Sequence, residues 1–329
     1  MRKPTIYDVA SSANVSPSTV SRYLNKKKNI EPEKIEAIEA AIARLHYQPR
    51  KKRGGQRSMT IGVAVPSLTD PFVLTILSGI TNEARDSTFR LEISNYHRCP
   101  NEELNVIRSF KSRNIDGLII IGGTRQSVDV KCIMADTPVV LVCRPENDVY
   151  PTIWPNNIIG GLMATNHLIQ QGHTRIVHLA SSNRNFDCVE RKAGYLQGLK
   201  LAGIPIDFNL VIEGRLNLEG GYRAIKQLIE KKTYFTAIFA ANDLSAFGAM
   251  RALNDYGFKV PEDVSVIGFD NHAMCDYYIP KLTTVKQPLA EIGQCAYRAI
   301  LDEMRGGELS IQFPPFEIIT RSSTGKPNA

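Results

Sequence analysis

The sequence lacks the long apolar run, the leader and the cysteine spacing that mark membrane, secreted and metal-binding proteins. No stretch approaches the roughly 18 uninterrupted apolar residues of a membrane-spanning helix, and the first residues, MRKPTIYDVA, have no apolar signal-peptide core. The six cysteines are scattered without CxxC pairs, and the histidines stand alone. We therefore expect free thiols in a reducing cytoplasm, no membrane contact, no metal and no cofactor.

Motifs of several common enzyme classes are missing as well. No GxGxxG follows the apolar run at 61–65, and neither a P-loop nor a GxSxG nucleophile elbow occurs. The sequence thus predicts a protein that is not an enzyme. A transport binding protein is disfavoured because a leader is absent and because the N-terminal region is strongly basic.

Charge is concentrated at one end of the chain. Residues 1–58 hold 13 Lys and Arg against 5 Asp and Glu, a net charge of +8, whereas the remainder holds 27 against 28. The whole chain of 329 residues carries +7, with 43% hydrophobic and 22% charged residues, which is ordinary for a globular protein of two or three domains. A basic head on a nearly neutral body suits a protein whose head alone meets phosphate groups.

Two short helical patterns, separated by a tight break, occupy residues 5–25. Apolar residues recur at i, i+3, i+4 and i+7 in the first pattern, starting at Ile6. Asn14 tolerates the left-handed conformation that ends a helix, and Ser16-Pro17 is typical of an N-cap and first helical position. The second helix would turn Val20 inward and leave small polar groups and a guanidinium outside. This pattern predicts a helix-turn-helix whose second helix enters a major groove.

The outer face of the second helix supplies the predicted DNA contacts. We expect Ser18 and Arg22 to reach base edges, with Arg22 suited to guanine O6 and N7, and Pro17 to contact DNA by shape. Contacts that hold phosphates and fix the register are predicted for Thr5, Tyr7, Ser16, Thr19, Ser21, Asn25, Lys26, Arg50, Lys51 and Arg53. The alternatives are a helical pair that only packs on a larger domain and, at 26–28, a solvated loop.

The remainder of the N-terminal region completes a three-helix head and a linker. Glu31-Pro32 opens a third helix that ends near Pro49, so the head spans 1–49. The segment RKKRGGQRS at 50–58 links head and body. Gly54-Gly55 disfavours a helix there by roughly 1 kcal/mol per glycine relative to alanine. A basic arm that follows phosphates or lies in the minor groove is therefore favoured.

Strands and helices alternate from Met59 onward. Buried strands are predicted at 60–65, 90–94, 117–121, 139–142, 176–179, 237–240 and 264–268. Helices are predicted at 70–87, 102–112, 157–171, 189–202, 219–230 and 243–256. This alternation predicts an α/β body made of two doubly wound parallel sheets with right-handed crossovers.

Both parts of the chain resemble the lactose-repressor (LacI) family. The stretch YDVASSANVSPSTVSR at 7–22 matches the family's helix-turn-helix motif at every fixed position. Body segments such as QGHTRI at 171–176 and VPEDVSVIGFD at 260–270 match too, so the resemblance covers residues 4–323. It implies an all-α three-helix head and a two-lobed body like that of periplasmic sugar-binding proteins, with the ligand between lobes joined by three crossings.

The resemblance also implies a domain plan and a function. The effector-binding and dimerisation domain would span 59–329, with lobe 1 at about 59–156 and 288–316 and lobe 2 at about 157–287 and 317–329. The protein would be a bacterial, nucleoid-associated repressor that binds operator double-stranded DNA as a homodimer and responds to a small-molecule effector. The linker departs from the family pattern, since it lacks the alanine and the leucine that wedges into the minor groove.

Polar residues follow several predicted strands, which is where ligands of open α/β sheets bind. Effector contacts are predicted for Asp70, Phe72, Asn95, Arg144, Arg191, Asn242, Asp270 and Gln287. The resemblance itself implies this role for Arg191, Asp270 and Gln287. Structural alternatives stay open for others. Asp70 and Asn242 could cap helices and Phe72 could belong to the core. Arg144 could pair with Glu146 or Asp148.

The predicted site chemistry suits a sugar-like effector. Carboxylates and amides bridge neighbouring hydroxyls, and arginine donates to ring oxygens or carboxylates. Arg98 and Arg215 add positive charge and hint at an anionic ligand. The expected effector is therefore a sugar, a sugar acid or a sugar phosphate. The alternative is a purine or another non-sugar metabolite that acts as a co-repressor.

Overall fold

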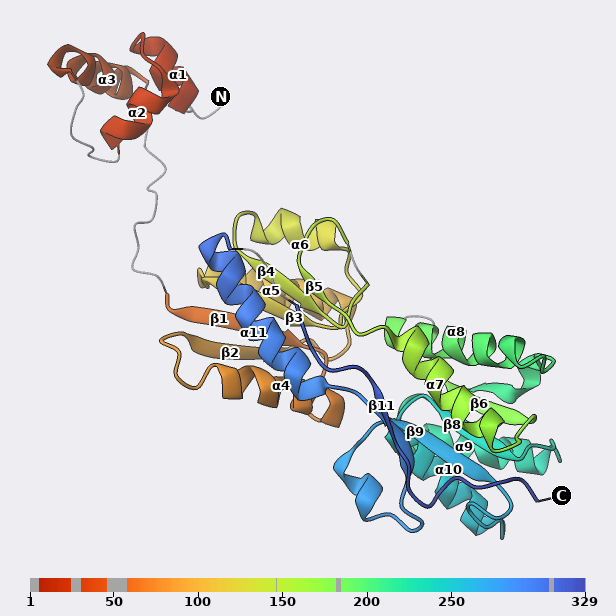
Figure 1. The fold of residues 1–329 in the computed structure, drawn as a ribbon. Helices are drawn as coiled ribbons and strands as arrows, with labels where there is room; N and C mark the ends of the chain where they lie inside the picture. Colours follow the sequence, from red (N-terminus) through yellow and green to blue (C-terminus); the bar gives the residue numbers. More distant parts are fainter. Residues whose placement is uncertain are drawn as a thin grey trace. The chain divides into compact units, whose positions relative to one another are not determined.

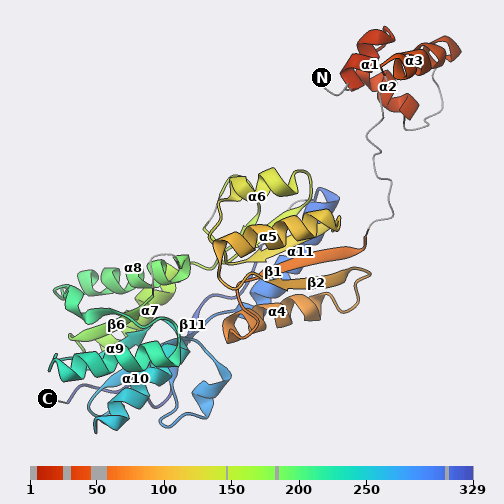
Figure 2. The ribbon, with the colours of Figure 1, turned by 180° about the vertical axis from the view of Figure 1, so that it is seen from behind.

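A computed structural model describes residues 6–24, 31–45, 58–145, 147–181, 185–307 and 311–328. The chain divides into two compact units, 1–58 and 59–329, drawn in Figure 1 and, from behind, in Figure 2. Within the described ranges, no helix is both long and apolar enough to span a membrane. All six cysteines are free thiols.

The N-terminal unit contains three helices, α1 (Ile6–Ser12), α2 (Pro17–Leu24) and α3 (Pro32–Arg44). Their apolar faces meet in a small core that includes Val9, Ala10, Val20 and Ile38. The break between α1 and α2 forms as expected: Asn14 has a φ of 51° and the Val15 N–H donates to the Ala10 carbonyl at 3.0 Å. The head is therefore a helix-turn-helix closed by a third helix, as the sequence predicted.

The first sheet of the body has the strand order β2-β1-β3-β4-β5, and all its pairs are parallel. Its strands are β1 (Thr60–Val65), β2 (Arg90–Asn95), β3 (Gly117–Ile121), β4 (Val139–Val142) and β5 (Thr152–Ile153). Helices α4 (Pro71–Glu83) and α11 (Leu289–Arg305) pack against one face through one apolar cluster. Helices α5 (Pro100–Ser112) and α6 (Ser127–Met134) cover the other, seen in front in Figure 2.

The second sheet has the order β11-β10-β9-β8-β6-β7. Its strands are β6 (Ile176–Ala180), β7 (Val211–Glu213), β8 (Ala237–Ala240), β9 (Ser265–Asp270), β10 (Thr283–Lys286) and β11 (Glu317–Ile319). Helices α7 (Asn157–Gln170) and α8 (Phe186–Leu201) lie on one face and α9 (Leu218–Glu230) and α10 (Asp243–Asp255) on the other. Short 3₁₀ turns occur at Phe208–Leu210 (η1) and Ala273–Asp276 (η2).

The chain passes between the two sheets three times. It leaves the first sheet after β5, returns after β10 to form α11, and comes back as β11 at the edge of the second sheet (Figure 1). The predicted pair of doubly wound sheets is thereby confirmed with one correction: β11 pairs antiparallel with β10. Each sheet is buried on both faces, which explains why strands such as GLIII at 117–121 are apolar throughout.

Helices α7 and α8 touch backbone to backbone at two glycines. A Cβ built on Gly161 would lie 2.2 Å from the Arg191 carbonyl oxygen, and one on Gly194 would lie 2.2 Å from the Ile158 carbonyl oxygen. Both distances are far shorter than a van der Waals contact, so an added Cβ would clash. The clashing atoms belong to the backbone and cannot rotate away as a side chain can. Glycine at these positions therefore sets how closely α8, and with it Arg191, approaches α7.

We predict that Gly194→Ala lowers the free energy of unfolding of the protein by about 1–3 kcal/mol, because the added methyl forces α8 away from α7. Urea denaturation followed by circular dichroism measures the change. Gly307→Ala is the matched control, since a Cβ there meets no atom closer than 3.7 Å. Equal stability of both variants and the wild type would show that the helix contact is not as tight as described.

Candidate DNA-binding face and effector cleft

The predicted recognition helix α2 starts at a capped, exposed end. The Thr19 N–H donates to Ser16 Oγ at 3.2 Å, and the Ser16 and Thr19 hydroxyls lie 2.8 Å apart. Ser16 and Pro17 are exposed while Val20 is fully buried, so the first turn of α2 presents a polar surface. Tyr23 does not belong to that surface, because its hydroxyl donates to Glu39 on α3 at 2.7 Å.

Several predicted DNA contacts fall outside what the structure describes. Ser18, Ser21 and Arg22 lie on α2 and Tyr7 lies on α1, but only their backbone is described. Outside the described residues altogether are Thr5, Asn25, Lys26, Arg50, Lys51 and Arg53. The DNA contacts thus stay predictions at these positions.

A cavity of about 610 Å³ opens between the two sheets of the body. We call the part of the body around the first sheet the first lobe and the part around the second sheet the second lobe. The first lobe contributes Asp70, Phe72 and Arg98 to the lining of the cavity. The second lobe contributes residues that follow β6, β8 and β9, among them Arg191 and Asp270. The cavity therefore lies beyond the carboxyl ends of strands from both sheets, where the sequence predicted the effector site.

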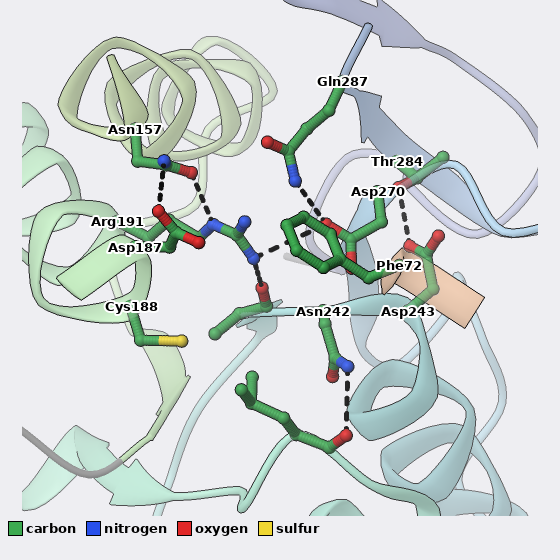
Figure 3. A network of polar contacts seen from close by, with 12 residues as sticks. Phe72, Asn157, Asp187, Cys188, Arg191, Asn242, Asp243, Asp270, Thr284 and Gln287 are labelled. Atoms are coloured by element: carbon green, nitrogen blue, oxygen red, sulfur yellow. Dashed lines mark hydrogen bonds and ion pairs between the residues drawn. The ribbon is translucent and has the colours of Figure 1, made fainter. Parts of the chain in front are cut away.

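Arg191 is the central group on the second lobe's wall of this cavity (Figure 3). Its Nε donates to Asn157 Oδ1 at 2.9 Å, and its Nη1 donates to the Ala241 carbonyl at 2.5 Å. Nη1 also lies 3.6 Å from Asp270 Oδ1, and the guanidinium carbon lies 3.9 Å from the centre of the Phe269 ring. The side chain is thus fixed from three directions in an environment that is almost fully buried.

Asp270 ends β9 opposite Arg191 and accepts a hydrogen bond from Gln287 Nε2 at 2.6 Å. Burial raises the pKa of Asp270 to about 8, although the nearby Arg191 charge acts to lower it. The carboxylates of Asp243 and, on the first lobe, Asp70 raise it further. Burial therefore outweighs the Arg191 charge, and the protonated form of Asp270 is favoured more than in a free aspartate.

Asp243 supports the end of β9 from behind. Its carboxylate accepts hydrogen bonds from the Thr284 hydroxyl and from the His272 N–H, both at 2.6 Å. Burial raises its pKa to about 6. Asp270 has a φ of 106°, a strained value for a side chain other than glycine, and the bonds of Asp243 hold the chain that follows it.

Sequence reasoning missed Asp187, which lines the cavity from the first turn of α8. Its Oδ1 accepts a hydrogen bond from Asn157 Nδ2 at 3.1 Å. Burial raises its pKa to about 6, although Arg191 acts to lower it. The signal was available, because α8 follows β6 and its first turn must lie at the same sheet edge as the other predicted residues.

The structure brings most, not all, of the predicted effector residues to the cavity. Asp70, Phe72, Arg191, Asn242 and Asp270 line it. Gln287 is buried behind Asp270, and among the described lining residues neither Asn95 nor Arg144 occurs. The side chain of Asn95 shapes a turn instead, because its Oδ1 accepts from the His97 N–H at 2.8 Å.

Two predicted residues combine a structural role with their place in the lining. Asp70 caps α4, since its Oδ1 accepts from the Phe72 N–H at 3.0 Å. Asn242 caps α10 in the same way through the Ser245 N–H at 3.0 Å. Both capping alternatives therefore occur. Phe72 also packs against the first lobe's core.

Arg144 forms a buried ion pair that the sequence did not suggest. Its Nη2 donates to Glu103 Oε1 at 2.7 Å and to the Arg125 carbonyl at 2.8 Å, and the side chain is buried. Asp148 is not a partner that the structure describes, and Glu146 lies outside the described residues. Glu103 lies 41 residues earlier on α5, a separation that local sequence inspection does not reveal.

Within the described ranges, no cluster of three or more His, Cys, Asp and Glu side chains could hold a metal ion. The described lining of the cavity instead offers hydrogen-bond donors and acceptors, with the guanidinium groups of Arg98, Arg191 and Arg215 and the carboxyl groups of Asp70, Asp187, Glu213 and Asp270. Such groups bind a polar small molecule by orientation and charge.

Known proteins match both parts of the chain. Residues 5–50 match the family described as bacterial regulatory proteins, lacI family, and residues 165–324 match a periplasmic binding protein-like domain. The HTH-type transcriptional repressor PurR of Vibrio atlanticus is 32% identical over 307 residues, 92% of each chain. The HTH-type transcriptional repressor CytR of Escherichia coli is 32% identical over 97% of this chain and 96% of its own.

Solved structures of similar proteins extend over the same length. A lac repressor dimer bound to operator and the anti-inducer ONPF has a TM-score of 0.76 at 28% identity, covering 98% of this chain and 100% of that one. The transcriptional regulator CelR in complex with cellobiose has a TM-score of 0.74 at 28% identity, covering 97% and 99%. With its helix-turn-helix head and two-lobed effector-binding body, the chain belongs to the LacI family of bacterial transcriptional regulators and is not an enzyme.

Proposed function

We propose that this regulator binds its operator as a homodimer and that a sugar or sugar derivative in the cleft alters its affinity for that operator. The observation that carries the proposal is the cavity between the lobes, whose wall holds Arg191 in place by three hydrogen-bonding and stacking contacts. A ligand that contacts both walls favours one separation of the lobes over another. It therefore shifts the population of conformations by its difference in affinity.

In the head, we propose that Ser18 and Arg22 read base edges and that Pro17 contributes by shape. The exposed first turn of α2 and its capped start support this assignment. Ser16, Thr19 and Ser21 would hold phosphates, together with Thr5, Tyr7, Asn25, Lys26, Arg50, Lys51 and Arg53. The net charge of +8 on residues 1–58 favours contacts of this kind.

Exposed apolar side chains on the body support the proposed dimer. Ile279 is 92% exposed and Tyr277 78% exposed, just after η2. Leu68, Leu74 and Ile93 are exposed around α4 and β2 on the first lobe. In both views the light-blue segment that contains η2 lies on the same flank of the body as α4. Apolar surface of this extent on both lobes suits a second copy of the chain.

A sugar-like effector is supported by the acceptors and donors around the cavity. The CelR structure holds cellobiose, and another solved relative from Enterococcus faecium, 29% identical with a TM-score of 0.73, holds ribose. In this chain, Asp270 and Asp187 offer carboxyl oxygens beside the Arg191 guanidinium. Such alternation matches the neighbouring hydroxyls of a sugar, each of which donates and accepts.

We predict that Arg22→Ala reduces the preference for operator over unrelated DNA more than it reduces total DNA binding. Losing a bidentate contact to guanine removes about 1–3 kcal/mol of discrimination. Gel shifts with genomic fragments at two salt concentrations measure both quantities. Lys34→Ala on the neighbouring helix, an exposed residue paired with Glu31, serves as the control. If wild type and Arg22→Ala bind every fragment alike, Arg22 does not read bases.

We further predict that Arg191→Met weakens the response to effector while leaving operator binding intact. A thermal-shift panel of sugars, sugar acids, sugar phosphates and purines would identify compounds that stabilise the wild type. Their affinity should fall at least about tenfold in the variant, because a charge-assisted hydrogen bond contributes about 1.5–3 kcal/mol. Arg175→Met, which removes a partner of Asp207 away from the cavity, is the control. An unchanged response of Arg191→Met would place the effector elsewhere.

A further inference from the structure

We propose that the buried ion pair between Glu103 and Arg144 is a positioning pair for the effector: it holds the loop 122–125 in the first lobe's wall of the cavity, although neither side chain belongs to the described lining. The inference rests on the proposed function, because it concerns the ligand of the same cavity. It means that effector affinity depends on two residues that act through the loop.

The loop 122–125 follows β3 and forms part of the cavity wall. Gly122, Gly123 and Thr124 belong to the lining. Gly122 and Gly123 have φ values of 62° and 95°, in the left-handed region that favours glycine. The Gly122 N–H still donates to the Val142 carbonyl at 2.8 Å. Since β3 ends at Ile121, the position of the residues after Gly122 depends on contacts other than the sheet.

Glu103 on α5 and its partner Arg144 supply those contacts. Glu103 Oε2 accepts the Thr124 N–H at 2.9 Å and the Arg125 N–H at 3.3 Å. Glu103 Oε1 accepts from Arg144 Nη2 at 2.7 Å. The same Arg144 nitrogen donates to the Arg125 carbonyl at 2.8 Å. The pair therefore bonds to two N–H groups and one carbonyl of the loop backbone.

The ion pair also fills the space beneath Gly123. A Cβ built on Gly123 would lie 2.5 Å from Glu103 Oε1 and 2.7 Å from Arg144 Nη2. The side chains of Glu103 and Arg144 are only 1% and 5% exposed, so both are enclosed by protein. The loop backbone thus lies directly on the pair. A displacement of either side chain would displace this part of the cavity wall.

Apolar side chains could replace the packing of Glu103 and Arg144 but not their bonds to the loop. Replacing a buried ion pair by well-packed apolar residues is often neutral for stability. Apolar residues, however, offer no acceptor to the Thr124 and Arg125 N–H groups. A carboxylate suits this position because each of its oxygens accepts from a different partner, whereas an amide has a single oxygen. The particular contribution of the pair is therefore the orientation of the loop.

Other contacts hold the two ends of the loop without the ion pair. The Tyr96 hydroxyl donates to the Ile121 carbonyl at 2.7 Å. The Arg125 side chain donates to the Pro100 carbonyl at 2.9 Å and to Asn101 Oδ1 at 2.7 Å. These anchors remain when the pair is altered. A variant of the pair should therefore loosen the middle of the loop while its ends stay attached.

The first arm of the test needs no ligand and uses the full-length protein. Arg144→Met removes the guanidinium, and Glu103→Gln leaves one oxygen for both sets of donors. We expect the amides of the loop to exchange hydrogen at least about tenfold faster in both variants, because bonds to a charged group are lost or weakened. Hydrogen–deuterium exchange with mass spectrometry on a peptide that covers 122–126 measures the rate.

Two further variants keep this arm decisive, since removing one charge of a buried pair can prevent folding. Gly123→Ala leaves both charges in place but directs a methyl group at them, so it should also speed exchange in the loop. Gly62→Ala is the control for lost stability. A Cβ there would lie 2.8 Å from Ile115 Cδ1 and 3.0 Å from Phe110 Cδ1, and so perturbs the first lobe's core. It should lower the melting temperature without selectively speeding exchange at 122–126.

The second arm measures effector affinity by thermal shift and calorimetry. The probes are ribose, glucose, glucuronate, glucose 6-phosphate and adenine. A probe that stabilises the wild type should bind about three- to tenfold more weakly to Arg144→Met, Glu103→Gln and Gly123→Ala, the equivalent of about one lost hydrogen bond. Gly62→Ala should bind it as the wild type does, because a loss of stability alone leaves the wall in place.

The outcomes separate this inference from the proposed function. If the loop of Arg144→Met and Glu103→Gln exchanges at the wild-type rate, or no faster than in Gly62→Ala, the pair does not hold the loop and the inference fails. If the loop exchanges faster but these variants bind the probe normally while Arg191→Met binds it weakly, the cavity is the effector site and the pair does not position it. If Arg191→Met binds the probe like the wild type, the proposed effector site itself is wrong.

Discussion

The guanidinium of Arg191 is the interaction on which the second lobe's share of the cavity depends. It connects α7 through Asn157, the end of β8 through the Ala241 carbonyl, and the end of β9 through Asp270 and Phe269. These elements come from three separate parts of the chain. A charged group can be buried among them only because each of its sides meets an acceptor or an aromatic face. The buried part of the second lobe's polar wall is thus arranged around the Arg191 guanidinium.

The first lobe uses the same chemistry for a different purpose. Arg144 and Glu103 form a buried ion pair at 2.7 Å, and the other Glu103 oxygen accepts the backbone N–H groups of Thr124 and Arg125. This network joins α5 to the ends of β3 and β4, and through Thr124 it reaches the cavity lining. Removing one partner of such a pair would leave a buried, uncompensated charge, which is strongly destabilising. Arg191 therefore lines the cavity, whereas Arg144 holds α5 to the ends of β3 and β4.

Much of the architecture could be predicted from local pattern. The apolar stripe from Ile6 and the Ser16-Pro17 cap specify the head, and long apolar runs such as 117–121 specify buried parallel strands. The short strands β5, β7 and β11 were missed, because two or three residues carry no periodicity. Helices α6 and α11 and strand β10 were not predicted either. Strand β11 forms by pairing antiparallel with β10, and no residue pattern within 317–319 indicates this pairing.

Residues of the candidate site were predictable where their position at a strand end places them in the cavity. They were not predictable where a partner far away in the sequence determines their contacts. Asp70, Arg191 and Asp270 reach the cavity because strand ends of a parallel sheet meet at one edge. Arg144 follows the same rule, yet it is captured by a carboxylate on another helix. The raised pKa of Asp187 comes from its burial, and its hydrogen bond comes from Asn157, 30 residues earlier. Neither can be inferred from the residues next to Asp187.

The glycine contact between α7 and α8 links the cleft residue Arg191 to the first crossing between the lobes. Gly161 lies against the Arg191 carbonyl and Gly194 against that of Ile158, so the backbones of the two helices are in direct contact. Helix α7 begins at Asn157, directly after the first crossing between the sheets. Arg191 on α8 is therefore separated from that crossing only by the contact between two helices. A displacement of Arg191 would be passed to the crossing through α7, without further intermediate residues.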